Sequence, residues 1–383
     1  MSEGDLSDDR LRHATGWAFD QDTPKRFAVA VSGGGDSMAC LDLMLWHGRN
    51  RGFPVDAVTV DHGLRADAAD EIALVAAYCQ TQKIPHTVLN WIWDGQGNLQ
   101  AKARDARYSL ISEWGQEAGV NLVALGHTQD DVAETFLMRL ARQSGVDGLA
   151  HMEARFERGG LTWVRPMMAH RRADWRTYLE RHDIAWADDP SNDDSAFERV
   201  RARQVLQALA PLGIEADKIA SVARNVESAK SALIHYSFAE IAEHKAVAVD
   251  RGDVILPEVA TSRDHFIPPE IIRRLKTGAL QWVSGAKYPP RSNTLLNLDV
   301  AHTMGADRHT LSGCLVTHIK ADRAIDRRYR ITREYNAVKN LVSSTDALWD
   351  GRWVLEGPHS PDLELRPLGE AVKDCPDWRE TGL

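Results

Sequence analysis

The stretch Phe27-Ala-Val-Ala-Val-Ser-Gly-Gly-Gly-Asp-Ser-Met-Ala-Cys40 decides the fold of this chain. It begins with a short apolar run that is typical of a buried parallel strand. Small polar residues follow from Ser32 to Ser37, and apolar residues at helical spacing then predict a helix that opens near Asp36. A glycine-rich turn before a helix exposes backbone N–H groups at the positive end of the helix dipole. The stretch therefore predicts an anion-binding loop suited to phosphate.

The loop matches neither of two common nucleotide-binding patterns. The kinase-type loop ends in Gly-Lys-Ser/Thr, and no lysine is present here. The dinucleotide pattern Gly-x-Gly-x-x-Gly is broken, because Asp36 and Ser37 occupy its last part. A glycine-rich turn without a ligand is the alternative, although the flanking serines and the aspartate disfavour it.

The loop instead resembles the Ser-Gly-Gly-x-Asp-Ser signature of the PP-loop ATP pyrophosphatases. The resemblance implies that the loop holds the β- and γ-phosphates of ATP while the α-phosphate is attacked and pyrophosphate leaves. It also implies that Asp36 helps to hold Mg²⁺. The ATP-binding residues implied in the loop are Ser32, Gly33, Gly34, Gly35, Asp36 and Ser37. The acceptor stays open, since members of this superfamily adenylate several kinds of group.

Length and composition indicate an ordinary globular protein of two or three domains. The chain has 383 residues, of which 43% are apolar, enough for a real core. No run of eighteen apolar residues exists, so no transmembrane helix is expected. The acidic, polar residues 1–10 resemble neither a signal peptide nor a transit peptide, and we expect a cytoplasmic protein.

The cysteines and the net charge argue against two kinds of protein, those with a zinc or iron–sulfur site and those that wrap nucleic acid over their whole surface. The four cysteines lie far apart without a C-x-x-C pair, so we expect reduced, structural thiols and no zinc or iron–sulfur site. The formal charge of −9 argues against nucleic acid wrapped over the whole surface. A local basic patch remains compatible with that charge.

Strands that alternate with helices predict an α/β fold with a parallel sheet covered on both sides. Beyond the first strand, strands are expected at 55–61, 86–91 and 122–125, with helices at 66–82, 100–117 and 130–142. The predicted organisation is a lead-in at 1–24, a PP-loop catalytic domain at 25–205, a mainly helical tRNA-binding domain at 206–340 and a small β-containing unit at 341–383.

Polar residues follow the second strand, where ligands of parallel sheets bind. Asp61, His62 and Arg65 are placed to meet a nucleotide, with a helix-capping turn as the alternative. On the 100–117 helix, Arg104 and Arg107 share one polar stripe with a glutamine. Such a stripe suits a phosphate or a carboxylate, and a solvated charged face is the alternative.

The segment after the fourth strand carries a stronger signal. If a helix begins near His127, then His127, Asp131 and Glu134 fall at i, i+4 and i+7 and point the same way. Two carboxylates that point together repel unless a cation lies between them, and that cation is either a metal or an ammonium. The alternative is a pair of acids favoured by the helix dipole.

An ordered set of motifs resembles the bacterial tRNA(Ile)-lysidine synthetase family over residues 27 to about 203. After the loop, the motifs are His62-Gly-Leu-Arg65, Gln100-x-x-x-Arg104-x-x-Arg107-Tyr108, Gly126-His127 with Asp130-Asp131-x-x-Glu134-Thr135, Arg165-Pro166-Met167-Met168, and Asp188-Asp-Pro-Ser-Asn192 with Arg199-x-Arg201-x-Arg203. One departure is Thr128, where the family often has a second histidine.

This resemblance implies a two-step reaction. ATP would activate the wobble cytidine of tRNA(Ile) with a CAU anticodon, and free lysine would then attack through its ε-amine and release AMP. It implies catalytic roles for Asp36, His127 and Arg107, and lysine binding by Asp131 and Glu134. The oligomeric state is open, with a homodimer as one option.

Arginines interleaved with aromatic residues predict a local RNA-binding surface. One cluster combines Trp163, Trp175 and Tyr178 with Arg165, Arg171, Arg172, Arg176 and Arg181. Two more contain Arg199, Arg201 and Arg203, and Arg323, Arg327, Arg328, Arg330 and Arg333. The residues expected to bind tRNA are Arg171, Arg172, Arg199, Arg201 and Arg203. A solvated arginine face is the alternative for each cluster.

Two other functions stay in view at this point. A PP-loop tRNA thiolase would share the first motif, but its sulfur chemistry usually needs paired cysteines, which are absent. A non-catalytic, nucleotide-binding RNA chaperone would share the basic clusters.

Overall fold

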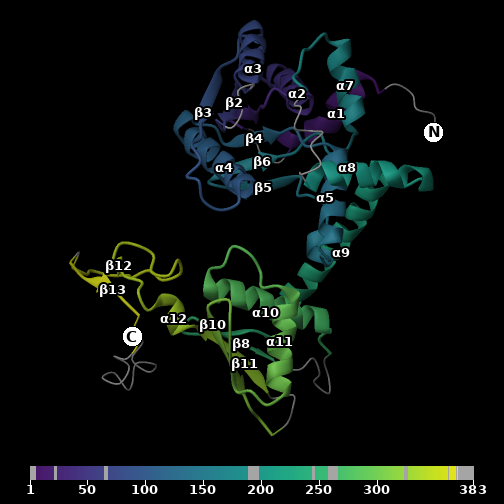
Figure 1. Cartoon of the computed structure of the whole chain (residues 1–383). Helices are drawn as coiled ribbons and strands as arrows, with labels where there is room; N and C mark the ends of the chain where they lie inside the picture. The colour runs from purple at the N-terminus through teal and green to yellow at the C-terminus, as the bar shows by residue number, and fades with distance from the viewer. Residues whose placement is uncertain are drawn as a thin grey trace. The chain divides into compact units, whose positions relative to one another are not determined.

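The computed structural model describes residues 6–20, 24–63, 68–188, 198–243, 246–257, 266–322, 327–360, 362–367 and 369. The chain divides into two compact units, Met1–Lys230 and Ser231–Leu383, drawn in Figure 1. The predicted α/β class is confirmed by the first unit, which holds a mostly parallel sheet.

The sheet of the first unit has six strands in the order β3-β2-β1-β4-β6-β5. Only β5 runs antiparallel to its neighbour. The strands are β1 (Phe27–Ala30), β2 (Val55–Asp61), β3 (His86–Asn90), β4 (Leu122–Leu125), β5 (Arg155–Arg158) and β6 (Leu161–Val164). Because β1 lies between β2 and β4, the loop after β1 sits between the ends of both neighbours.

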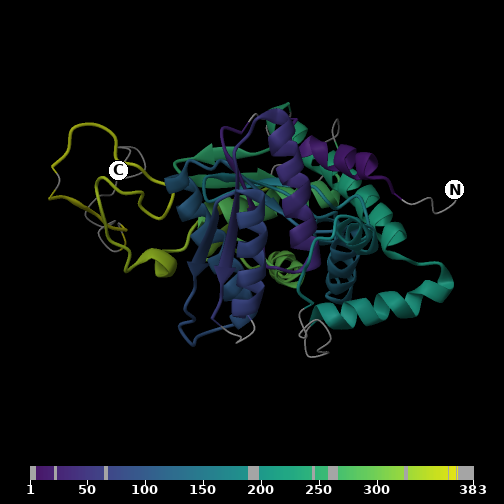
Figure 2. The ribbon, with the colours of Figure 1, turned by 90° about the horizontal axis from the view of Figure 1, so that it is seen from above.

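Helices cover both faces of this sheet (Figures 1 and 2). Phe27 and Val29 of β1 pack in one cluster with helices of the first face, whereas Ala28 packs with the opposite face. The first face holds α1 (Asp8–Thr15), α2 (Gly35–Arg51), α3 (Ala68–Gln82) and α7 (Arg172–Arg181). The opposite face holds α4 (Leu99–Ala118). This alternation along a single strand is what a parallel sheet buried on both sides requires.

A helical group extends the first unit beyond β4. Val132 and Ala133 of α5 are buried against alanines and Ile219 of α9. The helices are α5 (Gln129–Ala141), α6 (Val146–Leu149), α8 (Glu198–Leu209) and α9 (Ala216–Ala242), with 3₁₀ turns at Gly16–Phe19 and Ala210–Leu212. This packing fixes the start of α5 beside α8, where the candidate site lies.

The second unit is built on an antiparallel sheet in the order β7-β8-β11-β10-β9. The amphipathic helix α10 (Pro269–Ser284) and the helix α11 (Ser292–Thr303) share its core. The strands are β7 (Ala248–Asp250), β8 (Asp253–Pro257), β9 (Arg308–Leu311), β10 (Cys314–Ile319) and β11 (Arg328–Arg333). Strands β7 and β8 form a hairpin that turns between Asp250 and Asp253. Short elements follow at α12 (Tyr335–Val338), β12 (Ser343–Ser344) and β13 (Glu364–Leu365).

A buried histidine ties α1 to α2. The Nε2 atom of His47 lies 3.0 Å from Thr15 Oγ1 and 3.1 Å from the carbonyl oxygen of Arg12. Burial lowers the pKa of His47 to about 4, and repulsion from Arg51 acts in the same direction. The ring is therefore neutral in the folded protein near pH 7.

This low pKa predicts acid sensitivity of the fold. The unfolded chain binds a proton at His47 near pH 6.5, whereas the folded chain does so only near pH 4. The free energy of unfolding therefore falls as the pH drops through this window. The unfolding free energy of the wild type should be about 2 kcal/mol lower at about pH 5 than at about pH 7 because of His47, and His47→Gln should abolish this contribution. Urea unfolding measures it, with His13→Gln on the exposed face of α1 as the control. An unaltered pH dependence in His47→Gln would contradict the assignment.

Candidate active site

The loop between β1 and α2 has the backbone shape of an anion seat. Gly33 adopts φ +89°, in the left-handed region that favours glycine. A Cβ at Gly33 would also lie 3.1 Å from Glu71 Cβ. Gly34 is the extended N-cap residue, and the helix begins at Gly35, close to the predicted start. The first N–H groups of a helix have no intrahelical partner and can bind an anion.

Side chains and a neighbouring segment hold this loop in place. Ser37 Oγ donates to the carbonyl oxygen of Gly34 at 2.8 Å and accepts from the Ser32 N–H at 3.1 Å. The Ala187 N–H donates to the carbonyl oxygen of Gly33 at 2.9 Å. The loop is therefore preorganised, so binding a phosphate requires little reordering.

Gly126, at the end of β4, lets the fourth strand touch the loop. A Cβ at Gly126 would lie 2.6 Å from the carbonyl oxygen of Asp36 and 3.0 Å from Ser37 Cα. Both neighbours are backbone atoms, which yield less easily than the end of a flexible side chain. The absence of a side chain at Gly126 therefore brings His127 next to the loop.

Because the backbone of α2 lies so close to Gly126, adding a single methyl group there should reduce both ATP affinity and stability. Gly126→Ala should push the first turn of α2 away, weaken ATP binding at least about tenfold and destabilise the fold by about 1–3 kcal/mol. Calorimetric titration with ATP and urea unfolding measure the two effects. Gly145→Ala is the matched control, since a Cβ at Gly145 meets no atom within 4 Å. Wild-type ATP affinity in Gly126→Ala would contradict the described contact.

Helix α5 begins at Gln129, with Thr128 as its N-cap, one residue before the predicted start at 130 and two residues after His127. Asp131 Oδ2 accepts from the Thr128 N–H at 2.9 Å and from Thr128 Oγ1 at 3.0 Å, which completes a capping box. His127 therefore precedes the helix, and the predicted i, i+4, i+7 spacing is wrong for this residue. Asp131 and Glu134 still lie on adjacent turns, and both are buried.

The cation expected between these carboxylates is an arginine side chain. Arg172 Nη2 lies 3.5 Å from Asp131 Oδ1, and its Nη1 lies 3.3 Å from Glu134 Oε1. Its Nε donates to Asp36 Oδ2 at 2.8 Å. Arg172 thus bridges the phosphate loop and the acidic pair.

Two arginines of α8 complete the cluster. Arg199 Nη1 lies 3.4 Å from Asp131 Oδ1, and Arg203 Nε lies 2.7 Å from Glu134 Oε1. Arg172, Arg199 and Arg203 were expected to contact tRNA, whereas here each contacts a carboxylate of the site. The sequence shows acids and arginines but not their pairing, because about seventy residues separate α5 from α8.

Charged neighbours oppose the effect of burial on the pKa of two acids of the site, Asp131 and Asp36. Burial alone would raise the pKa of Asp131, but its neighbours, among them Arg199 and Arg172, lower it. Burial lowers the pKa of His127 so far that its ring is neutral near pH 7. For Asp36, burial raises the pKa and Arg172 opposes that shift. Asp131 and Asp36 therefore depend on neighbouring arginines to offset the effect of burial on their charge.

The cluster also contains unsatisfied polar atoms. Among the described residues, neither Glu134 Oε2 nor His127 Nδ1 has a hydrogen-bond partner, although both atoms are buried. A buried acceptor without a partner costs free energy unless a ligand or water satisfies it. Glu134 therefore presents one carboxylate oxygen that can accept a hydrogen bond from a bound donor.

The other predicted nucleotide contacts lie at the end of β2 and on α4. Asp61 Oδ1 accepts from the Gly63 N–H at 2.8 Å, so this carboxylate closes a turn. His62 packs edge-on against Trp91, and its pKa is lowered by burial and then by the charge of Arg107. Arg107 thus lies near the carboxyl end of β2. Arg65 lies outside the described residues.

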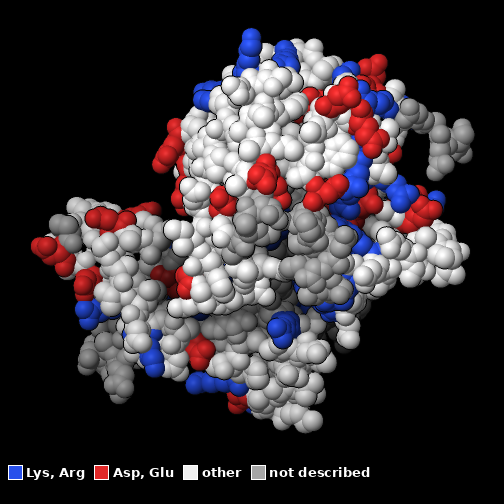
Figure 3. Space-filling view, turned by 45° about the horizontal axis from the view of Figure 1, so that its top comes forward, with Lys and Arg blue, Asp and Glu red and all other residues white. Residues whose placement is uncertain are grey.

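Two further arginines of the predicted clusters, Arg171 and Arg176, form surface ion pairs. Arg171 pairs with Glu215 at 2.7 Å and Arg176 with Asp188 at 3.1 Å, while Arg201 is exposed on α8. Basic and acidic side chains lie next to one another on the face drawn in Figure 3. The aromatic residues among these arginines do not contribute to the predicted RNA-binding surface, because they are fully buried on core-facing positions of β6 and α7. These residues are Trp163, Trp175 and Tyr178.

Arginines of the second unit are paired as well. Arg330 contacts Asp250 and Asp253, and Arg333 contacts Asp350. Arg323 of this cluster lies outside the described residues. These pairs hold β11 to neighbouring segments, a structural use that the sequence pattern alone does not reveal.

Asp130 is a site residue to which the sequence reasoning assigned no role, although it lies in one of the motifs that carry the family resemblance. Its Oδ2 accepts from the Arg172 N–H at 2.7 Å, and the neighbouring Gln129 N–H donates to the His170 carbonyl oxygen at 2.9 Å. These bonds join the start of α7 to the start of α5. Adjacent aspartates at a helix start were the only available signal, and they did not indicate a partner forty-two residues away.

The donor set fits a magnesium ion held jointly with phosphates. Within the described ranges, no group of three or more His, Cys, Asp or Glu side chains could hold a metal ion. Mg²⁺ in nucleotide sites usually binds one or two carboxylates, waters and the substrate phosphates. Asp36, in the first turn of α2 beside the loop, can supply such a carboxylate.

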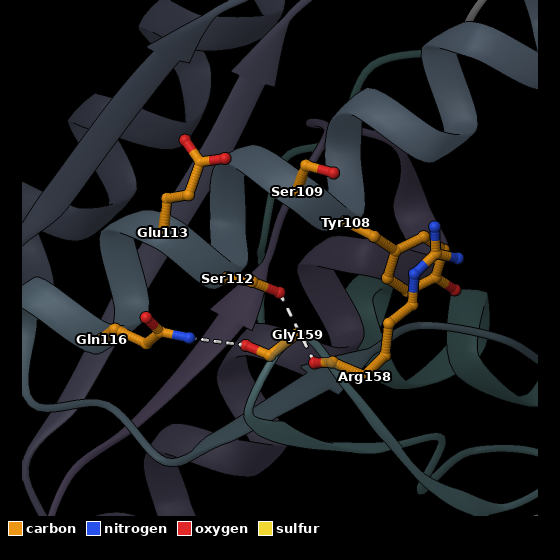
Figure 4. A pocket seen from close by; sticks show the side chains of 7 residues that line it. All are labelled: Tyr108, Ser109, Ser112, Glu113, Gln116, Arg158 and Gly159. Atoms are coloured by element: carbon orange, nitrogen blue, oxygen red, sulfur yellow. Dashed lines mark hydrogen bonds between the residues drawn. The ribbon is translucent and has the colours of Figure 1, made fainter. Parts of the chain in front are cut away.

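A pocket at the other end of the sheet is separate from this site (Figure 4). It lies where β6 begins, and parallel pairing of β4 with β6 places it at the amino ends of those strands. Gln116 Nε2 closes it by donating to the Gly159 carbonyl oxygen at 2.8 Å. Its lining residues are Tyr108, Ser109, Ser112, Glu113, Gln116, Arg158 and Gly159.

Comparisons with known proteins agree with this geometry. A family model described as a PP-loop domain matches residues 9–209. The tRNA(Ile)-lysidine synthase of Ruegeria pomeroyi is 45% identical over 375 residues, covering 95% of this chain and 84% of that protein. The tRNA(Ile)-lysidine synthase of Wolbachia pipientis wMel is 33% identical over 356 residues, covering 90% and 80%.

Solved structures add support for the fold alone. The U34-tRNA thiolase NcsA from Methanococcus maripaludis, with its [4Fe-4S] cluster, is similar with a TM-score of 0.50 at 15% identity, over 57% of this chain and 77% of that chain. In the part of the present chain that the structure describes, no helix is long and apolar enough to cross a membrane.

Proposed function

The chain belongs to the tRNA(Ile)-lysidine synthase family, and we propose that it ligates lysine to the wobble cytidine of tRNA(Ile) with a CAU anticodon. ATP is converted to AMP and pyrophosphate, and the reaction takes place in the cytoplasm. The observation that carries the proposal is a buried acidic pair, Asp131 and Glu134, directly beside a phosphate-binding loop. Such a site brings an amine next to an activated phosphate ester.

The first step is adenylation of the tRNA. N–H groups of the loop and the start of α2 hold the phosphates, and the cytosine oxygen attacks the α-phosphorus as pyrophosphate leaves. Mg²⁺ held at Asp36 would neutralise charge that develops on the phosphates. Arg107 and His62 border the same end of the sheet, and we assign them to the nucleotide.

The second step is attack by lysine. The ε-ammonium would be bound between Asp131 and Glu134, with Glu134 Oε2 accepting one of its hydrogen bonds. The amine must lose protons as it forms the bond to C2 of cytosine, and AMP leaves with the oxygen. His127 is neutral, adjacent and without a partner at Nδ1 among the described residues, so we assign it as a proton acceptor.

Contacts with tRNA are assigned to exposed arginines near this site. Arg171 and Arg201 are the best candidates, because the pair between Arg171 and Glu215 is solvent-exposed and Arg201 lies on the open face of α8. A phosphate can displace an exposed carboxylate at little cost.

Two alternatives are disfavoured. A thiolase would need clustered cysteines, whereas the cysteines in the described part of the chain, Cys40, Cys79 and Cys314, are buried, free of disulfides and on separate elements. A non-catalytic RNA chaperone would not need a preorganised phosphate loop joined to buried acids.

Exchange of labelled pyrophosphate into ATP separates these possibilities. We expect exchange that requires tRNA(Ile) with a CAU anticodon but not lysine. Exchange with ATP alone, or none with the tRNA, would contradict the proposal.

A further inference from the structure

We propose that Arg172 closes the amine site in the resting enzyme, and that nucleotide with Mg²⁺ opens it by displacing Arg172 from Asp36. Lysine binding would then be thermodynamically coupled to nucleotide binding. The inference rests on the proposed function, because it assumes that Asp131 and Glu134 receive the ammonium of lysine.

The first argument is occupancy. The guanidinium of Arg172 touches both carboxylates that the proposed function gives to the substrate, at 3.5 Å for Asp131 and 3.3 Å for Glu134. An incoming ammonium would need the same oxygens. The two cations therefore compete for one buried place.

The second argument is repulsion among the cations. Asp36, Asp131 and Glu134 are paired with the side chains of three arginines, namely Arg172, Arg199 and Arg203, while the adjacent Asp130 accepts from the Arg172 backbone N–H. Binding an ammonium at Asp131 and Glu134 without displacing an arginine would place a further cation on buried oxygens that arginines already contact, which is unfavourable. One arginine must therefore leave the acids when lysine binds.

The third argument identifies Arg172 as the side chain that leaves. Arg199 and Arg203 each contact one acid of the pair, whereas Arg172 lies across both. Its shortest side-chain contact is with Asp36, at 2.8 Å. A divalent cation at Asp36 would compete for that oxygen and repel the guanidinium, so only the two longer contacts would remain. Phosphates on the adjacent loop offer the displaced guanidinium a new anionic partner.

The fourth argument is that this movement requires no backbone change. The Arg172 N–H is fixed by Asp130 Oδ2 at 2.7 Å, and α7 continues into the core through Trp175 and Tyr178. Rotation of an arginine side chain on a fixed helix start is enough to open the acidic pair.

Calorimetric titration of lysine into the full chain tests this coupling. We expect wild-type protein to bind lysine at least about tenfold more tightly with Mg²⁺ and a non-hydrolysable ATP analogue than without them. By reciprocity, lysine should tighten binding of the analogue by the same factor. Norleucine, which lacks the ε-ammonium, should show no such coupling.

The variant Arg172→Gln should bind lysine at least about tenfold more tightly than wild type in the absence of nucleotide, and the analogue should add little. Arg176→Gln removes the same charge one turn later on α7, where Arg176 pairs with exposed Asp188, and should behave as wild type. If Arg172→Gln does not fold, the titration of wild-type protein still tests the inference. Equal lysine affinity of the wild type with and without the analogue would overturn it.

The two proposals fail in different ways. Nucleotide-enhanced lysine binding that persists in Arg172→Gln would overturn the role of Arg172 and leave the lysine site standing. No lysine binding by wild type, even with the analogue, would overturn the lysine site itself and this inference with it.

Discussion

Replacing Asp36 with asparagine is expected to lower the rate of tRNA-dependent pyrophosphate release by about a thousandfold. The change keeps the shape of the side chain but removes the carboxylate that faces the phosphate loop and contacts Arg172. The variant should lose both the proposed Mg²⁺ ligand and the anchor of Arg172. Filter binding should still detect tRNA at near wild-type affinity, since Asp36 lies beside the nucleotide.

A matched control tests whether the loss of any carboxylate charge would have the same effect on pyrophosphate release. Asp9 on α1 is exposed and pairs only loosely with Arg12, at 3.7 Å. Asp9→Asn should release pyrophosphate at the wild-type rate. Normal turnover in Asp36→Asn would contradict the assignment of this loop to the phosphates of ATP.

Replacing Glu134 with glutamine is expected to raise the lysine concentration for half-maximal rate by one to two orders of magnitude, as when one partner of a buried charge pair is removed. Glutamine has nearly the same shape but cannot supply an anionic oxygen like Glu134 Oε2, which is buried and has no hydrogen-bond partner among the described residues. Adenylated tRNA should still form and should accumulate at low lysine. Single-turnover analysis of the two half-reactions measures both effects.

Glu134 is a cleaner probe than Asp131. Asp131 caps α5 through Thr128, so Asp131→Asn would also disturb the helix start by about 1 kcal/mol. Arg107→Gln provides the contrast, because it should slow adenylation without changing the lysine dependence. If Glu134→Gln slows only adenylation, the acidic pair serves a metal rather than lysine.

The sequence predicted most of the elements that position the site. The strands at Phe27–Ala30, Val55–Asp61 and Leu122–Leu125 lie within a residue or so of their predicted ranges. Apolar runs followed by glycine-rich or polar turns carry that information locally. Strands β5 and β6 were missed. Strand β5 contains two arginines and a glutamate, so it has no apolar run that would indicate a strand.

Pairing between distant side chains could not be predicted. The carboxylates of α5 and the arginines of α7 and α8 were identified, but an arginine-rich segment reads equally well as an RNA-binding surface. Only the fold brings Arg172 onto Asp36, Asp131 and Glu134. In the same way, the capping role of Asp131 depends on where α5 begins, which periodicity locates only to within a turn.

Mass spectrometry of tRNA(Ile) with a CAU anticodon, incubated with the protein, ATP and lysine, tests the central claim most directly. We predict a product heavier by one lysine less one water, located at the wobble cytidine, and formed only when both ATP and lysine are present. An unmodified tRNA, or the same product without ATP, would contradict the account.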